Sequence, residues 1–401
     1  MSKSNCLNRI NTEVGANSSY ITKKALRKAI HKHLLNSGFA NNGNKYLINE
    51  KMNKQKIREL HAPNRMKILK ENCSFINKFA ESSLEHFANG NEINPEAIDP
   101  VLIEVASETL ESNLFRFATL LWSVPVSQGF GRRMRFLVKD RQNDKLIGIF
   151  ALCDPVFNLK VRDRHIGWNS EDRKKRLVHV MDSYVVGAVP PYSLLIGGKL
   201  VAALMGCSEV KKIYERKYLN RVSIISGVAK RARLVLLTTT SALGRSSIYN
   251  RLSIPGGTQF IQIGTTKGFG HFHLSVGIFN LMRKYLDQIG HPYAFGNRFG
   301  MGPNWKIRVV RAVLDDIGLN SNDILNHGIE REVYLMPLAE NWREILLGHH
   351  KNVRSRVLPL EKISEFCLKR WITPRAKRDK RYKEFNKSMI KSQIMNEDSL
   401  Y

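Results

Sequence analysis

A glycine-rich loop beside three cations is the first candidate for chemistry in this sequence. Gly129 and Gly131 precede Arg132, Arg133 and Arg135, so a flexible backbone and three guanidinium groups lie within a few residues of one another. Backbone N–H groups and guanidinium groups are both good donors to phosphate oxygens. We therefore predict that the three arginines contact nucleic acid.

The segment Gly264–His273 interleaves Lys267 with glycines and the rings of Phe269 and Phe272. This arrangement suits base stacking plus backbone contact on a single strand or a distorted duplex. The alternative is the packed, glycine-rich end of a hairpin. The segment is not a P-loop, because the GxxxxGK[ST] spacing is missing. We include Lys267 among the predicted nucleic-acid contacts.

Two histidines of the same segment raise the question of a metal site. His271 and His273 are two residues apart in a predicted strand, so they face one side, and this spacing can ligate a metal. No Cys or carboxylate pattern completes the set, and we predict no metal. Asp315 and Asp316 end a predicted helix and are expected to be ion-paired surface groups. No GxSxG or HExxH motif supports hydrolytic catalysis.

The segment 245–251 gathers hydroxyl and guanidinium groups within two turns of a predicted short helix. Arg245 and Arg251 flank Ser246, Ser247 and Tyr249. Such a set can clamp a phosphate with side chains and a helix N-terminus. The alternative is a serine N-cap on an ordinary amphipathic helix.

An apolar run followed by a compact set of charges occupies residues 146–168. Residues 146–152 predict a buried strand, and the residues after the next turn alternate as in the second strand of a hairpin. The hairpin would end in a charged corner formed by Arg162, Asp163 and Trp168. We predict that Asp163 fixes Arg162 as part of the architecture; the alternative is that Arg162 contacts nucleic acid.

The charge balance indicates a polyanionic partner. Lys and Arg total 64 against 35 Asp and Glu, which gives a formal net charge of +29. This excess is typical of proteins that bind nucleic acid. A hydrophobic fraction of 43% excludes a disordered or fibrous chain. Five widely spaced cysteines, no signal-peptide core and no run of 18 apolar residues predict a cytoplasmic protein without a membrane partner.

Cations concentrate in several segments. A basic helix is predicted from Thr22 to Gly38, and a second over 51–90 that is kinked or broken at Pro63. The tail from Lys369 is predicted to be a mobile basic arm or a helix that orders on a partner. These segments and a glycine-rich turn near residue 300 add further predicted nucleic-acid contacts: Lys24, Arg27, Lys28, Lys32, Arg298, Lys306, Arg375, Lys377, Arg378, Lys380 and Arg381.

The elements that must position these residues alternate between strand and helix. Periodicity and punctuation predict helices over 95–117, from 194 or 198 to 218 and over 246–252, and strands over 134–138, 146–152, 180–189, 234–240 and 260–266.

This order of elements resembles the GNAT acyltransferase superfamily. The resemblance implies that a loop after the fourth strand, here PPYSLLIGG before Lys199, feeds a helix whose N-terminus binds the pyrophosphate of coenzyme A. It also implies that Tyr249, the one candidate catalytic residue, lies near the leaving thiolate. The RxxGxG or QxxGxA signature of the superfamily is absent, so we predict no cofactor, with acetyl coenzyme A as the alternative.

A resemblance that covers more of the chain is carried by LFRFATLLWSVPVSQGFGRRMRFLVKD, LIGIFALCDPVF, RDRHIGW, GRSSIYNRL, IGTTKGFGHFH and REVYLMPL. From about residue 25 to about residue 348 the sequence resembles the DruA family of the Druantia anti-phage defence systems. The resemblance implies a multi-subunit bacterial defence complex that includes a helicase-like protein. It implies no active site residue by residue.

These observations predict an α/β (α+β) protein with a GNAT-like mixed sheet flanked by helices. The predicted segments are a basic helical module over 1–93, an acyltransferase-like core over 94–350 and a basic tail over 351–401. The predicted function is a noncatalytic, nucleic-acid-binding subunit that acts with a helicase-like partner on phage DNA. The alternatives are a coenzyme A-dependent acyltransferase and a scaffold for acidic partner subunits.

Overall fold

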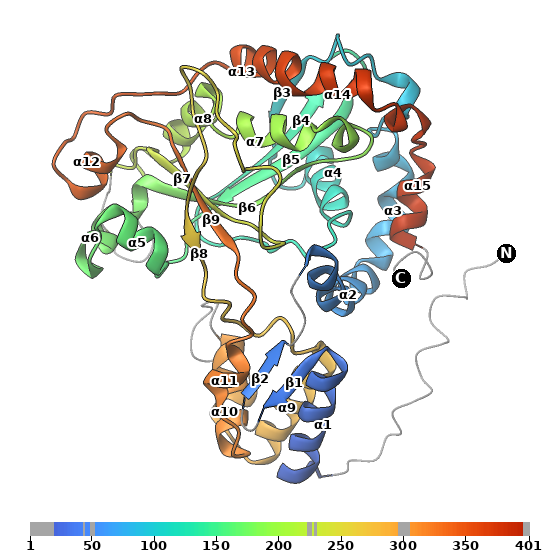
Figure 1. Cartoon of the computed structure of the whole chain (residues 1–401), viewed down its shortest axis with the longest axis vertical. Helices are drawn as coiled ribbons and strands as arrows, with labels where there is room; N and C mark the ends of the chain where they lie inside the picture. The colour runs from blue at the N-terminus through green and yellow to red at the C-terminus, as the bar shows by residue number, and fades with distance from the viewer. Residues whose placement is uncertain are drawn as a thin grey trace. The chain divides into compact units, whose positions relative to one another are not determined.

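The computed structural model describes residues 20–42, 45–48, 53–222, 227, 231–295 and 305–395. Contacts divide the chain into two compact units (Figure 1). The first unit takes residues 1–51 and 269–327, and the second takes residues 52–268 and 328–401. The division does not follow the three predicted segments, because the first unit combines two stretches that are far apart in the sequence.

The second unit is built on a sheet of seven strands: β3 (Pro100–Glu104), β4 (Arg133–Asp140), β5 (Lys145–Cys153), β6 (Val180–Ala188), β7 (Leu236–Thr240), β8 (Ile261–Thr265) and β9 (Glu332–Pro337). Their spatial order is β3-β4-β5-β6-β7-β9-β8. All neighbours are antiparallel except β6 and β7, which are parallel. A parallel pair needs a crossover, supplied here by α7 (Gly197–Leu204) and α8 (Ser208–Tyr218). The predicted mixed α/β class is confirmed.

Helices cover both faces of this sheet. Side chains alternate along β4, so Phe136 joins the core under α7 and α8, whereas Leu137 joins the core on the other face. The helices on that other face are α3 (Cys73–Leu84) and α4 (Leu110–Thr119). A third core cluster lies under α5 (Lys160–Ile166) and α12 (Trp342–Leu347). The remaining helices of the second unit are α2 (Lys54–Glu71), α6 (Ser170–Arg176), α13 (Leu360–Cys367), α14 (Thr373–Arg378) and α15 (Ser388–Met395).

Short helical turns complete the described elements. They are the 3-10 turns η1 (Gly90–Glu92), η2 (Leu177–His179), η3 (Tyr192–Leu195), η4 (Pro292–Phe295) and η7 (Arg381–Glu384), and the π turn η6 (Leu368–Ile372). None of the helices that the structure describes is long and apolar enough to cross a membrane.

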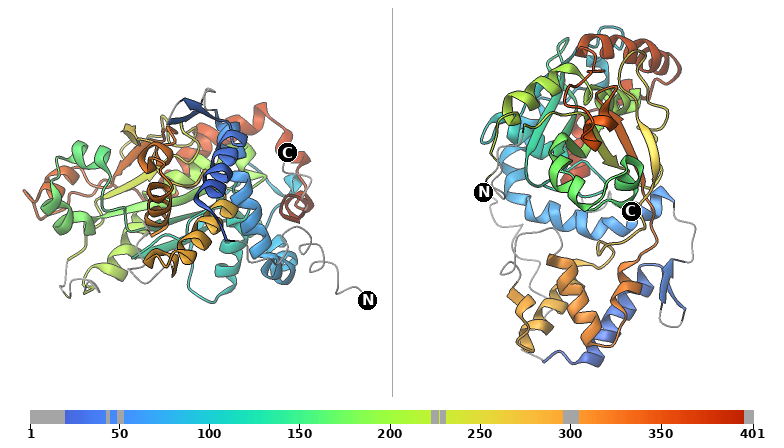
Figure 2. Two further views of the ribbon diagram at one scale, coloured as in Figure 1. Left: turned by 90° about the horizontal axis from the view of Figure 1, so that it is seen from below. Right: turned by 90° about the vertical axis from the view of Figure 1, so that its left-hand side faces the viewer.

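The C-terminal segment packs onto the second unit, so the prediction of a mobile arm is wrong for the residues up to 395. Ile363, Ile372 and Tyr382 are buried in the core under α7, and Ile390 is buried in the core under α4. Helix α15 lies beside α3 (Figure 1, Figure 2). The sequence pattern misled because its few apolar residues are widely spaced among cations.

The first unit joins the basic N-terminal helix to residues inserted between β8 and β9. It contains α1 (Lys23–Asn36), the hairpin of β1 (Phe39–Asn42) and β2 (Lys45–Ile48), α9 (Val276–Gln288), α10 (Trp305–Asp316) and α11 (Ser321–Leu325). The predicted start of α1 is confirmed, because Thr22 accepts a hydrogen bond from the backbone N of Ala25 at 3.1 Å. One face of α1 buries Leu26, Ile30 and Leu34.

Two segments of the chain adopt a secondary structure that differs from the predicted one. Residues 156–166 do not continue a hairpin; α5 forms instead and ends at Gly167, which adopts a left-handed φ of 94°. Residues 95–117 form β3 and then α4 rather than one helix, because β3 pairs with β4 and Thr109 caps α4 by accepting from Ser112 N at 3.2 Å.

Three helix boundaries also differ from the prediction. Helix α2 runs through Pro63, whose missing N–H lies on an exposed position, and ends at Glu71 instead. The predicted helix to residue 218 is split into α7 and α8 at Gly206, where a side chain would meet Thr258 Oγ1 at 2.7 Å. The predicted helix over 246–252 is a series of turns, because the chain turns left-handed at Arg251.

Candidate nucleic-acid interface

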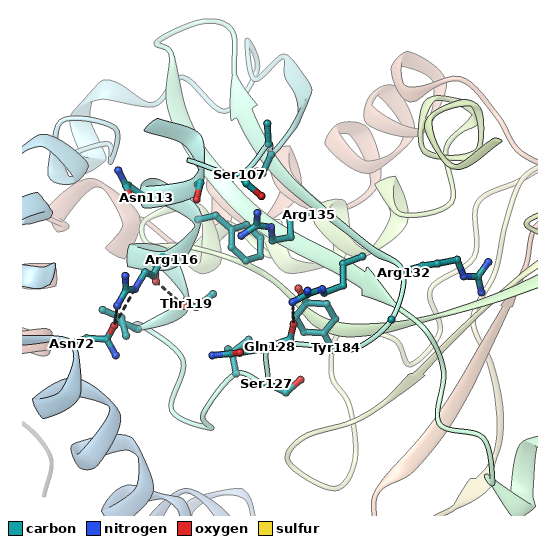
Figure 3. A pocket seen from close by; sticks show the side chains of 18 of the residues that line it. Asn72, Ser107, Asn113, Arg116, Thr119, Ser127, Gln128, Arg132, Arg135 and Tyr184 are labelled. Atoms are coloured by element: carbon teal, nitrogen blue, oxygen red, sulfur yellow. Dashed lines mark hydrogen bonds between the residues drawn. The ribbon is translucent and has the colours of Figure 1, made fainter. Parts of the chain in front are cut away.

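A groove with a volume of about 1220 Å³ lies in the second unit where α4, the start of β4 and the end of α8 meet (Figure 3). Its walls also include the end of α2 and the loop before β4. Most lining side chains are polar or charged. The cations are Arg116, Arg132, Arg133, Arg135, Lys217 and Arg221, the carboxylate is Glu71, and the aromatic rings are Phe115, Tyr184 and Tyr218.

The alternation of β4 positions two of these cations. Arg133 and Arg135 share the strand face of Leu137, which is buried beneath α3 and α4. Toward the start of the strand this cover ends, so Arg135 is half-buried and Arg133 is exposed. Neither side chain forms an ion pair with a carboxylate of the described residues, and both remain available to an anion.

Arg132 has a structural role and does not offer a free positive charge to the groove. Figure 3 shows its side chain pointing away from Arg135. Its guanidinium donates to Asp154 Oδ1 at 2.7 Å, to Val178 O at 2.7 Å and to the hydroxyl of Tyr214. Gly131 permits this approach, because a side chain there would meet Asp154 Oδ2 at 2.0 Å. The prediction of Arg132 as a nucleic-acid contact therefore has little geometric support.

Arg116 extends the groove from the last turn of α4. Its guanidinium donates to Asn72 Oδ1 at 3.0 and 2.6 Å and lies 4.0 Å from the ring centroid of Phe75. These contacts hold an exposed cation in one position, which lowers the entropy cost of binding an anion.

Helix α8 supplies the opposite side of the groove. Tyr218 locks this end of the helix to β4, since its hydroxyl donates to Arg133 O at 2.9 Å and accepts from Arg133 N at 3.1 Å. Lys217 pairs with Glu104, whereas the guanidinium of Arg221 lies 5.9 Å from the ring of Tyr218. The lining has six cations and one carboxylate, and two of the cations, Arg132 and Lys217, pair with carboxylates outside it.

A tyrosine on the floor of the groove remains a hydrogen-bond donor at neutral pH. Burial raises the pKa of Tyr184 to about 12, although Arg135 and Arg133 act in the opposite direction. A neutral hydroxyl can donate to a phosphate oxygen. The groove therefore offers guanidinium groups, amides and hydroxyls to an extended anion.

The charged corner is buried and structural. Arg162 is fully buried and donates to Asp163 Oδ1 at 2.9 and 2.7 Å. Its guanidinium lies 5.6 Å from the ring of Trp168, and Trp168 donates to Leu346 O at 2.6 Å. The alternative role of Arg162 as a nucleic-acid contact is contradicted by its burial.

Tyr249 is also buried and packs against Phe260 and Tyr334. Burial raises the pKa of its hydroxyl to about 12. Ser246 accepts from the backbone N of Tyr249 at 3.0 Å, as an N-cap would, although no helix follows. These contacts leave the phenol without access to a substrate.

None of the remaining predicted contacts among the described residues is part of the groove lining. Lys24, Arg27, Lys28, Lys32 and Lys306 are exposed in the first unit, and Arg298 lies outside the described residues. In the second unit the other predicted cations are exposed except Arg375, which is half-buried and pairs with Asp379 at 2.7 Å. The other predicted cations of the second unit outside the groove are Arg245, Arg251, Lys267, Arg375, Lys377, Arg378, Lys380 and Arg381.

The two histidines considered for a metal do not lie on a strand, and His273 is buried beside the ring of His327. Burial lowers the pKa of His273 to about 3 and that of His271 to about 4. Among the described residues, no group of three or more His, Cys, Asp or Glu is arranged to hold a metal ion.

Sequence reasoning missed Arg116, Lys217, Arg221 and the groove itself. The available signal was one cation in the last turn of α4 and two in the last turn of α8. That signal does not say that both helices end beside β4, since the contact joins residues about 85 apart in the chain, such as Arg133 and Tyr218.

Comparison with known proteins gives matches over most of the chain. A family model described as Druantia protein DruA matches residues 51–348. A curated Druantia protein DruA from Escherichia coli (strain UMEA 4076-1) is 44% identical over 359 residues, which cover 89% of each chain. No solved structure matches.

Proposed function

Because the chain belongs to the DruA family, whose members are components of an anti-phage defence system, we propose that it serves that defence as a noncatalytic, nucleic-acid-binding subunit. In this proposal the groove between α4, β4 and α8 binds the sugar-phosphate backbone of phage DNA. The protein then acts with other Druantia subunits, including a helicase-like partner.

The observation that carries the proposal is the charge imbalance of the groove. Arg133 and Arg135 project from one strand without a carboxylate partner among the described residues, and Arg116 is fixed beside them. Such a surface attracts polyanions, and polar neighbours such as Asn113 and Gln128 can bond phosphate or sugar oxygens. The net charge of +29 adds a favourable long-range field.

We expect the purified protein to bind DNA with an affinity that falls steeply with salt. Each phosphate contact contributes about −0.9 to the slope of log K against log salt on duplex DNA. Fluorescence anisotropy with a labelled oligonucleotide from 50 to 300 mM salt, roughly the range in which the effect is large, measures this slope. A scaffold for acidic proteins would instead show no steep binding to any oligonucleotide, which would contradict the proposal.

The alternative, a coenzyme A-dependent acyltransferase, fits the residues at the N-terminus of α7 poorly. A side chain at Gly197 would meet Tyr192 O at 2.7 Å, and one at Gly198 would contact Ile248 at 3.4 Å. Lys199 is turned away to donate to Asn250 O at 3.0 Å and lies 5.3 Å from the ring of Trp371. Gly197 is thus closely packed by the chain itself, and the Lys199 side chain is engaged by other residues of the chain.

We therefore expect no binding of acetyl coenzyme A. Isothermal titration of the protein at micromolar concentration with millimolar acetyl coenzyme A measures the heat of binding directly. Desulfo coenzyme A is titrated in the same way for comparison. Saturable heat with either ligand would favour the acyltransferase.

A further inference from the structure

Two loops of the second unit expose large apolar side chains, and one of these loops borders the groove. Phe130 is 39% exposed, Val156 is 42% exposed and Phe157 is 43% exposed. Phe130 lies between the groove-lining residues Gln128 and Gly131. Exposed aromatic rings next to cations are typical of surfaces that bind unpaired bases.

The loop that carries Phe130 is held in one conformation. Gly129 and Gly131 have positive φ values of 62° and 65°. A side chain at Gly129 would meet Cys153 and the ring of Tyr184 at 2.9 Å, so the backbone packs directly on β5 and β6. The backbone on both sides of Phe130 is therefore closely packed, and the ring of Phe130 is partly exposed to solvent.

The loop that carries Phe157 is braced by the buried corner. Arg162 donates to Val156 O and Phe157 O, both at 2.9 Å, while Asp163 holds its guanidinium from the other side. Arg173 bonds Asp163 at 3.1 Å and places its guanidinium 5.2 Å from the ring centroid of Phe157. The brace thus positions both the ring and a neighbouring cation.

The two loops are pinned together at Asp154. Its backbone N donates to Phe130 O at 3.1 Å, and its carboxylate accepts from the backbone N of Arg132 at 3.0 Å. Asp154 lies two residues before Val156 in the chain. Phe130 and Phe157 are consequently carried by loops that are fixed to each other, and we call Phe130, Val156 and Phe157 together the aromatic shelf.

We propose that the aromatic shelf stacks the bases of a single-stranded nucleic acid whose backbone follows the groove. This inference rests on the proposed function, because it assigns the backbone to the same groove. Paired bases are covered by their neighbours in a duplex, whereas a single strand can expose its base faces to Phe130 and Phe157. The cations Arg133 and Arg173 beside the shelf match the charge of the strand.

The test compares a labelled thymidine oligonucleotide, the uridine oligonucleotide of the same length and a duplex, using the full chain. We expect wild-type protein to prefer the single strands. The double substitution Phe130→Leu with Phe157→Leu, which keeps apolar side chains but removes the rings, should weaken single-strand binding by about tenfold or more. Duplex binding should change far less, and Phe130→Trp with Phe157→Trp should retain the single-strand affinity.

Leu281→Ala is the matched control, because Leu281 is 38% exposed in the first unit and should leave every affinity unchanged. If the leucine variant and wild type bound single strands with equal affinity, the shelf proposal would be overturned. This holds even if the aromatic shelf were found to bind a protein. Wild-type preference for duplex would do the same. Failure of wild type to bind any of the three oligonucleotides would instead overturn the proposed function of the groove.

Discussion

Reversing the charge of Arg133 and Arg135 by substitution with glutamate is expected to weaken DNA binding by about 100-fold or more at moderate salt, because hydrogen bonds to charged groups contribute about 1.5–3 kcal/mol each. Both guanidinium groups project from one face of β4 into the groove and lack carboxylate partners among the described residues. Two lost phosphate contacts should also reduce the salt slope by about two units.

The control for this variant applies the same change of charge elsewhere on the second unit. Lys369→Glu with Arg370→Glu alters two exposed cations on the π turn between α13 and α14, away from the residues that line the groove. We expect a much smaller loss of affinity, attributable to net charge alone. Equal losses for the two variants would show that the groove is not the binding surface.

Removing the buried guanidinium of Arg162 is expected to produce the largest loss of stability. Arg162→Ala removes both donors to Asp163 Oδ1, so that the only ion pair that Asp163 keeps among the described residues is the one with Arg173, and it leaves the carbonyl groups of Val156 and Phe157 without this donor. Breaking a buried ion pair by deleting one member typically costs about 3–5 kcal/mol. Urea-induced unfolding followed by circular dichroism measures the change in the free energy of unfolding.

The matched variant for this loss is Arg141→Ala, since the ion pair of Arg141 with Asp99 is 3.0 Å long but exposed on both sides. Exposed pairs contribute about 0–1 kcal/mol. A double-mutant cycle of Arg162→Ala and Asp163→Ala should also show a coupling above about 1 kcal/mol. Additive losses, or an Arg162 variant no less stable than the Arg141 variant, would contradict the brace.

Much of the sheet could be predicted from the sequence, because a strand that is buried on both faces appears as a continuous apolar run. Residues 146–153 form such a run within β5, and residues 234–237 form one that leads into β7. Residues 156–161 misled for the opposite reason. Val156 and Phe157 are apolar but exposed, so their alternation with polar residues does not report a buried strand face. The error therefore falls on the loop that we assign to base stacking.

Only the part of the groove that a single strand contributes could be predicted from the sequence. Arg133 and Arg135 lie two residues apart in a predicted strand, which places both on one face. Arg132 resembled them in sequence, but Asp154, 22 residues away, pairs with it. The contributions of α4 and α8 depend on how distant helices pack, and no local pattern records that packing.

The discontinuity of the first unit has a consequence for synthesis. Helix α1 leaves the ribosome long before α9, although its buried residues Leu26, Ile30 and Leu34 belong to a unit completed only by residues 269–327. An isolated helix of 14 residues is marginal in water. During synthesis the apolar face of α1 therefore gains its complete packing surface only after most of the sheet has been translated.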